Sequence, residues 1–160
     1  MTSAGRRPAS GARQRRGRGS ITHAYPPDPT SVPAARRLVA EELTGVPRGT
    51  VDTVVLLVSE LATNCVVHAG TGFELRLERT AGVVRVEVTD QGVGMPTPRH
   101  PRPLEPSGRG LQIVDMLATT WGVRQEQGGR GHTVWFTCRF SGGRAPTPAH
   151  RMATRVVRAR

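Results

Sequence analysis

The chain of 160 residues contains no lysine, so all 23 of its basic residues are arginines. Without lysine there is no Gly-Lys-Ser/Thr sequence, which excludes the Walker A loop of P-loop nucleotide-binding proteins. The only two cysteines, Cys65 and Cys138, each lie in an apolar pattern, which indicates reduced core thiols and a cytoplasmic protein. The sequence also lacks an apolar run that we expect to cross a membrane. Its basic N-terminus is not followed by an apolar segment, so we expect no secretory signal.

Acidic residues are missing from both ends of the chain. All twelve lie between Asp28 and Glu126, and residues 20–140 balance them with twelve arginines. The net charge of +11 therefore lies in residues 1–19 and 141–160. We interpret these as disordered basic tails around one neutral domain, residues 20–140, because they contain few large apolar residues. Such tails could bind nucleic acid without sequence preference, but we favour a solubilising role or an overlong gene start.

Two helices are predicted in the first half of this domain, after a short strand at residues 21–24. Ser31 and Thr50 are expected to cap them, and Gly70 is expected to end the second. The second helix has an apolar stripe at helical spacing, which predicts a core face. The stripe consists of Val54, Leu57, Val58, Leu61, Ala62, Cys65, Val66 and Ala69.

The pattern then changes to the two-residue period of strands. Apolar residues alternate with polar ones in residues 73–78 and 84–89, joined by a turn at residues 80–82. A proline-rich loop at residues 91–107 and a helix from about Gly110 come next. A hairpin of strands 121–126 and 132–140 ends the domain. We predict an α+β fold with a mainly antiparallel sheet and about three helices on one face.

Three polar side chains recur every fourth residue on the second helix: Glu60, Asn64 and His68. This spacing places a carboxylate, an amide and an imidazole along one side of the helix. A solvated polar face would give the same pattern, and from this helix alone the two interpretations are equally good.

Two glycine-containing segments could bind parts of a nucleotide. Asp90-Gln91-Gly92-Val93-Gly94 follows a strand, and its carboxylate could accept a hydrogen bond from the exocyclic amine of adenine. Gly108-Arg109-Gly110-Leu111 opens a helix, where free N–H groups can bind phosphate. Taken singly, the first segment could be an ordinary turn and the second a flexible helix entry.

The order of these segments resembles the N box and the two glycine boxes of the GHKL (Bergerat-fold) ATPases, which have an ATP lid between the glycine boxes. Within that superfamily the chain resembles the small bacterial anti-sigma factor serine/threonine kinases of partner-switching systems. Their pattern is Glu-Leu-x-x-Asn-x-x-x-His-Ala, then Gly-Arg-Gly-Leu, then Thr-Val-Trp-Phe, which corresponds here to residues 60–69, 108–111 and 133–136. The resemblance covers residues 20–140 and implies a two-layer α/β sandwich.

The resemblance implies that Asn64 ligates Mg²⁺ and that Asp90, helped by Thr133, binds the adenine amine. It implies that Glu60 orients or deprotonates the attacking hydroxyl, and that His68 is a structural core residue. Backbone roles follow for the glycine boxes, which would shape the base pocket and hold the phosphates. The residues of the base pocket are Gly92 and Gly94, and the residues that hold the phosphates are Gly108, Arg109, Gly110 and Leu111.

Three functions remain open at this point. The first is an ATP-dependent kinase that phosphorylates a serine or threonine of an antagonist protein and sequesters a sigma factor. The second is a non-catalytic module that binds ATP and exchanges partners. The third is a nucleic-acid-associated protein that acts through its tails. The resemblance also implies a homodimer, and no membrane partner is expected.

Overall fold

The computed structural model describes residues 14–15, 19–90, 109–126 and 131–141. Its strands form one antiparallel sheet in the order β1-β2-β3-β4-β6-β5. Their bounds are Gln14–Arg15, Ser20–Tyr25, Phe73–Thr80, Val83–Asp90, Thr120–Gln125 and His132–Arg139 for β1 to β6. The predicted tails and loop 91–107 lie outside these residues, apart from β1 and Gly19 at one end and Ser141 at the other.

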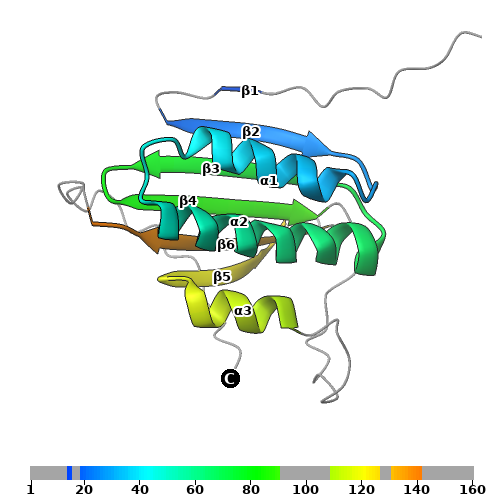
Figure 1. Ribbon diagram of the computed structural model, residues 1–160. Helices are drawn as coiled ribbons and strands as arrows, with labels where there is room; N and C mark the ends of the chain where they lie inside the picture. The colour runs from blue at the N-terminus through cyan, green and yellow to red at the C-terminus, as the bar shows by residue number, and fades with distance from the viewer. Residues whose placement is uncertain (1–13, 16–18, 91–108, 127–130, 142–160) are drawn as a thin grey trace, which may run out of the picture.

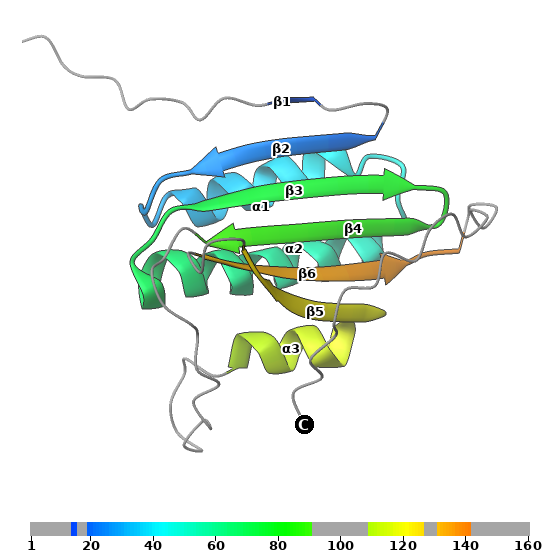
Figure 2. The same cartoon turned by 180° about the vertical axis from the view of Figure 1, so that it is seen from behind.

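The helices lie on one face of the sheet, as the two opposite views show (Figures 1 and 2). Their bounds are Ser31–Glu42 for α1, Arg48–Thr63 for α2 and Arg109–Leu117 for α3, and a π-helical turn, η1, extends α2 over Asn64–Ala69. The predicted α+β, two-layer arrangement is therefore confirmed.

The core lies between the helices and the sheet, where the predicted apolar patterns meet. Leu57 and Val58 of α2 are fully buried, as are Phe73 of β3 and Phe136 of β6. Buried residues alternate with exposed ones along β3 and with partly buried ones along β4, at the period that the sequence predicts. Ala81 and Gly82 form the turn between these strands, and Gly82 has a φ of 78°, a conformation that favours glycine.

Strand β6 pairs with β4, although α3 and β5 come between them in the sequence. The register pairs Thr89 with Thr133 and Val88 with Val134. Strand β4 therefore ends at Asp90 and β6 begins at His132, at the same end of two neighbouring strands.

Both cysteines are buried and free, as predicted. Burial raises the pKa of the Cys65 thiol to about 12, and the nearby negative charge of Asp90 adds to the effect. Burial likewise raises the pKa of Cys138 to about 11. Both side chains therefore behave as small apolar groups of the core.

The predicted helix caps, Ser31 and Thr50, are each a little late in the sequence, because Thr30 and Pro47 occupy the cap positions. Ser31 is buried inside α1, and its hydroxyl donates a hydrogen bond to the carbonyl of Pro26. Thr30 occupies the cap position, where its N–H and hydroxyl both donate to Asp28. Helix α2 begins one turn early, directly after Pro47, because the ring of proline fixes a φ that suits a helix start. Gly70 ends the helix as predicted, with a left-handed φ of 65°.

The continuous helix Arg48–Ala69 has 22 residues and contains an 18-residue window with a mean hydropathy of 1.5, so by length and composition alone it could cross a membrane. The sequence-based expectation that no segment reaches this length is therefore wrong. Its apolar residues have another use in this fold, because Val54, Leu57, Val58 and Leu61 are buried against the sheet. A core helix of this kind satisfies the same criteria as a membrane span.

Candidate functional site

Glu60 and Asn64 occupy successive turns near the end of α2. The backbone N–H of Asn64 donates to the carbonyl of Glu60, so the two side chains project from the same side of the helix, as predicted. Both residues are partly buried. Glu60 forms no ion pair within the described part of the chain, so its carboxylate remains available to a ligand or partner.

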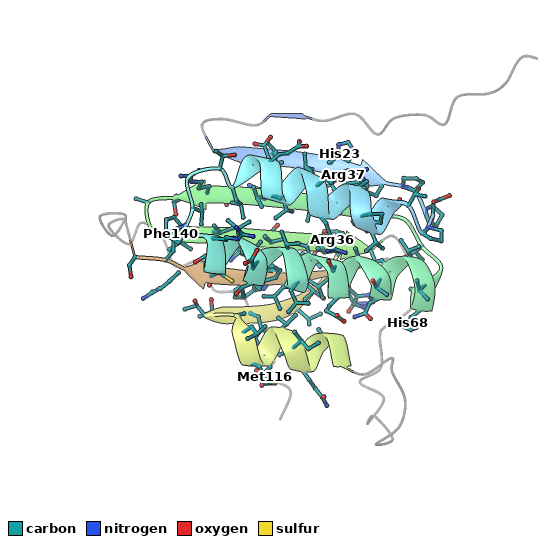
Figure 3. The ribbon with its side chains drawn as sticks, in the orientation of Figure 1. His23, Arg36, Arg37, His68, Met116 and Phe140 are labelled. Atoms are coloured by element: carbon teal, nitrogen blue, oxygen red, sulfur yellow. The ribbon has the colours of Figure 1, made fainter. Side chains whose placement is uncertain are left out.

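The π-helical turn that begins at Asn64 changes the direction of the residues after it. Hydrogen bonds there span five residues instead of four, so the residues after Asn64 no longer follow the α-helical spacing on which the prediction rests. The imidazole of His68 is exposed near the end of the helix (Figure 3). The prediction that His68 is a core histidine is therefore wrong, because the sequence pattern assumes an uninterrupted α-helix.

Asn64 is packed directly against the first turn of α3. A Cβ atom added to Gly110 would lie 2.7 Å from Nδ2 of Asn64, which is closer than non-bonded atoms normally approach. Gly110 is therefore the residue that lets the helix start and the amide come together. The first N–H groups of α3, which begins at Arg109, have no partner within the helix and carry its positive dipole end. Leu111 is partly exposed beside them.

Asp90 ends β4 on the face that the helices cover. Side chains alternate along a strand, and Asp90 shares the parity of the buried residues Val86 and Val88. Its charge acts on the thiol of Cys65, the residue after Asn64, so the strand end and the π-helical turn are close in space. The structure thus brings together the predicted carboxylate, the amide and the helix start.

His132 is a member of this site that the sequence patterns did not single out. Its Nδ1 lies 3.8 Å from Oδ2 of Asp90, and the residue is only 4% exposed. The signal was its parity in β6, since His132, Val134 and Phe136 are every second residue of the strand and must share one face.

Thr133 lies on the opposite face from Asp90, which corrects the prediction that the two act together. Its hydroxyl is 2.7 Å from the hydroxyl of Thr89, the neighbour of Asp90 in β4, and it donates to the carboxylate of Glu126. This bond, with a smaller contribution from Arg124, lowers the pKa of Glu126. Thr133 therefore connects β6 to β4 and to Glu126, the residue after β5, on the face without helices.

The chemistry of the donor set fits a magnesium–nucleotide complex. No group of three or more histidine, cysteine, aspartate or glutamate side chains that could hold a metal occurs within residues 19–90, 109–126 and 131–141. Mg²⁺ bound with a nucleotide needs few protein ligands, because phosphate and water oxygens complete its shell. A single amide oxygen from Asn64, next to a helix start that can bind phosphate, meets that need. Gly92, Gly94 and Gly108 lie outside the described residues.

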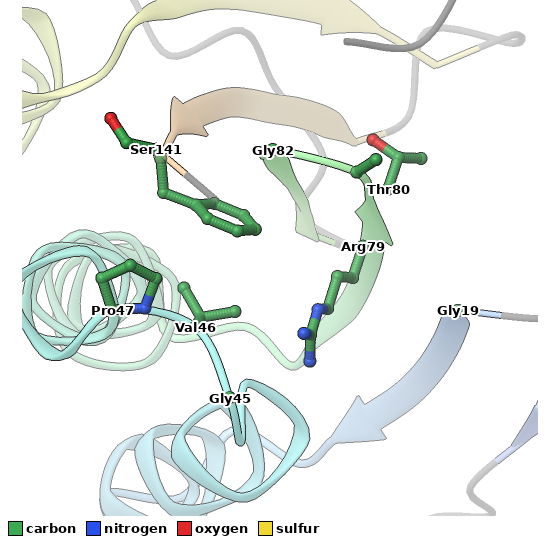
Figure 4. A pocket seen from close by; sticks show the side chains of 10 residues that line it. Gly19, Gly45, Val46, Pro47, Arg79, Thr80, Gly82 and Ser141 are labelled. Carbon is green, nitrogen blue, oxygen red and sulfur yellow. The ribbon is translucent and has the colours of Figure 1, made fainter. Parts of the chain in front are cut away.

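A separate hollow of about 830 Å³ lies at the far end of the sheet (Figure 4). It is lined by Gly19, residues 45–47 between α1 and α2, residues 79–82 of the β3–β4 turn, Phe140 and Ser141. These residues are at the end of β4 opposite Asp90, so the hollow contains none of the predicted site residues.

Comparison with known proteins agrees with this arrangement. The chain matches a solved structure of the RsbU and RsbW domains of Rv1364c from Mycobacterium tuberculosis, with a TM-score of 0.55 and 17% sequence identity. The match covers 75% of this chain and supports its fold. It covers 32% of the chain in the solved structure, so the present chain spans about a third of that relative's length. No curated protein matches the chain. The family model of the histidine kinase-like ATPase domain matches residues 25–138. Because that match covers most of the sequence, the chain belongs to the histidine kinase-like ATPase domain family.

Proposed function

We propose that this protein is an ATP-dependent serine/threonine kinase of the partner-switching type, which binds Mg-ATP where α2, β4 and α3 meet. The observation that carries the proposal is the contact between Asn64 and Gly110. It joins the helix that would supply the metal ligand to the helix start that would bind the phosphates. Asp90, near the same turn, would accept the amine of adenine.

Each described residue then has one task. Asn64 would bind Mg²⁺ through its amide oxygen, and the backbone of Arg109 and Gly110 would bind phosphate. The bound metal would neutralise charge on the phosphates during transfer. Gly92, Gly94 and Gly108 keep their predicted roles in shaping the base and phosphate sites.

Glu60 distinguishes a kinase from a simple ATP-binding module. It lies one helical turn before Asn64 and has no ion-pair partner among the described residues, so it would be close to the γ-phosphate without being neutralised. There it would accept the proton of a serine or threonine hydroxyl while the oxygen attacks phosphorus and ADP leaves. A module that only binds ATP has no need of this carboxylate.

The proposed partners are an antagonist protein, which is the phosphate acceptor, and a sigma factor. The sequence resemblance to anti-sigma factor kinases supports both, and the fold shared with a structure that contains an RsbW domain is consistent with them. Phosphorylation of the antagonist would decide which partner the protein holds. A homodimer and a cytoplasmic location belong to the same proposal.

Titration calorimetry tests the nucleotide site. We expect the full-length protein to bind Mg-ATP in the micromolar range and GTP much more weakly. Asn64→Ala should abolish the Mg²⁺-dependent part of the affinity. Failure of the folded wild-type protein to bind ATP would refute the proposal.

A phosphotransfer assay with labelled ATP and candidate antagonist proteins tests catalysis. We expect Glu60→Gln to bind ATP normally but to transfer phosphate at least about a hundredfold more slowly, the scale of general-base catalysis. Asp52→Asn, an exposed carboxylate on the same helix, is the matched control and should be fully active. ATP binding without transfer to any antagonist would favour the non-catalytic module. Loss of partner or polyanion binding on trimming residues 1–19 and 141–160 would instead favour the tails.

A further inference from the structure

His132 carries a buried polar atom that the fold leaves without a partner. The residue is 4% exposed, and its Nε2 makes no hydrogen bond within the described part of the chain. Leaving such an atom buried and unsatisfied is costly, so most buried polar atoms in native proteins are paired. An exception beside a ligand site indicates that the ligand supplies the partner.

The position of His132 in the sheet supports this interpretation. It is the first residue of β6 and shares the parity of Val134 and Phe136, which face the helices. Its other ring nitrogen, Nδ1, lies 3.8 Å from the carboxylate of Asp90. The ring is therefore next to the group expected to bind the amine of adenine, and Nε2 is its remaining polar atom.

We infer that Nε2 of His132 contacts the purine base beside Asp90 and helps to determine which base the site accepts. This inference rests on the proposed nucleotide site and adds a residue to it. Adenine carries a hydrogen-bond acceptor on each side of its amine, N1 and N7. A donor at Nε2 would bind one of these nitrogens while Asp90 accepts a hydrogen from the amine. The two contacts together select a base with a donor next to an acceptor.

This role separates His132 from Thr133. The two residues are adjacent in the sequence but point to opposite faces of the sheet, because Thr133 is bonded to Thr89 and Glu126. A substitution at Thr133 should therefore affect stability, whereas one at His132 should affect the choice of base.

Two substitutions test the inference. In His132→Gln the side-chain amide can take the place of Nε2, whereas in His132→Asn it reaches only as far as Nδ1. We expect His132→Asn to weaken ATP binding about tenfold, the scale of one buried hydrogen bond. His132→Gln should stay within about threefold of wild type. Melting temperatures of all three proteins control for folding.

Base analogues give a readout that a purely structural role would not change. ATP, 1-deaza-ATP and 7-deaza-ATP each keep the amine, and each deaza analogue lacks one acceptor. We expect one of the two deaza analogues to bind the wild-type protein about tenfold more weakly than ATP does. The same analogue and ATP should bind His132→Asn with equal affinity. The Nε2 signal of His132 in ¹⁵N NMR spectra should also shift when ATP is added.

The outcomes separate this inference from the proposed function. Suppose that the wild-type protein binds ATP, and that His132→Asn either keeps the wild-type affinity for all three nucleotides or loses affinity for all three by the same factor. The inference is then wrong and the nucleotide site stands. If both deaza analogues bind the wild type like ATP, or the Nε2 signal stays unchanged, the inference is also wrong. If the wild type binds no nucleotide, the proposed function fails and the inference with it.

Discussion

Replacing Gly110 with alanine should damage the nucleotide site while leaving the fold intact. The added methyl group would lie 2.7 Å from Nδ2 of Asn64 and 3.5 Å from Oδ1. Non-bonded heavy atoms are most stable about 3.5–4.0 Å apart, so the amide must move by most of an ångström. That amide is the proposed magnesium ligand, and its displacement should weaken Mg-ATP binding by about tenfold to a hundredfold, as other changes to metal-ligand support do.

The effect on folding is the small difference between two opposing terms. Alanine is favoured over glycine inside a helix by about 1 kcal/mol. Overpacking typically costs about 1–3 kcal/mol, and here it falls on the end of a partly exposed side chain, so the lower value applies. The two terms nearly cancel, and the melting temperature should change by no more than about 4 °C.

Gly49→Ala is the matched control, because Gly49 lies in the first turns of α2 and a Cβ added there meets nothing within 4 Å. This variant should bind Mg-ATP normally and be slightly more stable than wild type. The assay is titration calorimetry with ATP in the presence of Mg²⁺ and with EDTA, combined with thermal unfolding. Normal Mg-ATP affinity in Gly110→Ala, under conditions where Asn64→Ala loses it, would refute the reasoning.

Three further predictions concern the core, the open face of the sheet and the cysteines. Leu57→Ala should lower the free energy of unfolding by about 3 kcal/mol in denaturant titrations, whereas Leu56→Ala on the exposed side should change it by less than about 1 kcal/mol. Thr133→Val should cost about 1–2 kcal/mol of stability and leave ATP affinity unchanged; a loss of affinity without a loss of stability would place Thr133 in the site. Because burial raises the pKa of Cys65 and Cys138 above the usual 9.0, the folded and unfolded chains both keep these protons below pH 9. Above pH 9 the unfolded chain loses them first, so the free energy of unfolding should fall as pH rises towards 11, and less so in a variant with both cysteines replaced by alanine.

The sequence predicts this fold well where burial on one face determines a residue pattern. Leu57 and Val58 mark the core side of α2 by their helical spacing, and Phe73 and Val86 mark the core side of two strands by alternation. The meeting of Asn64 with the start of α3 followed only from the resemblance to a known family, because it joins segments far apart in the sequence. The periodic features are local, so a single sequence contains them.

The features that the sequence did not reveal are an irregular turn of one helix and contacts between distant segments. His68 is exposed on the π-helical turn, and nothing in the sequence spacing distinguishes this turn from a regular helix. The place of His132 beside Asp90 depends on the register between β4 and β6, which no local pattern records. Thr133 could have been assigned to the other face by its parity in β6, but the resemblance to a family motif suggested a role beside Asp90.

The pairing of β4 with β6 has a consequence for how the nucleotide site can change. Residues 91–131, which include α3 and the edge strand β5, lie between two residues that pair in one ladder, Thr89 and Thr133. Lengthening a loop whose ends are already held together costs little, about 0.6 kcal/mol of closure entropy for each doubling. Insertions between Asp90 and α3 should therefore alter nucleotide access or partner recognition without disturbing the sheet. The strand order thus separates the part of the chain that provides stability from a part that can vary.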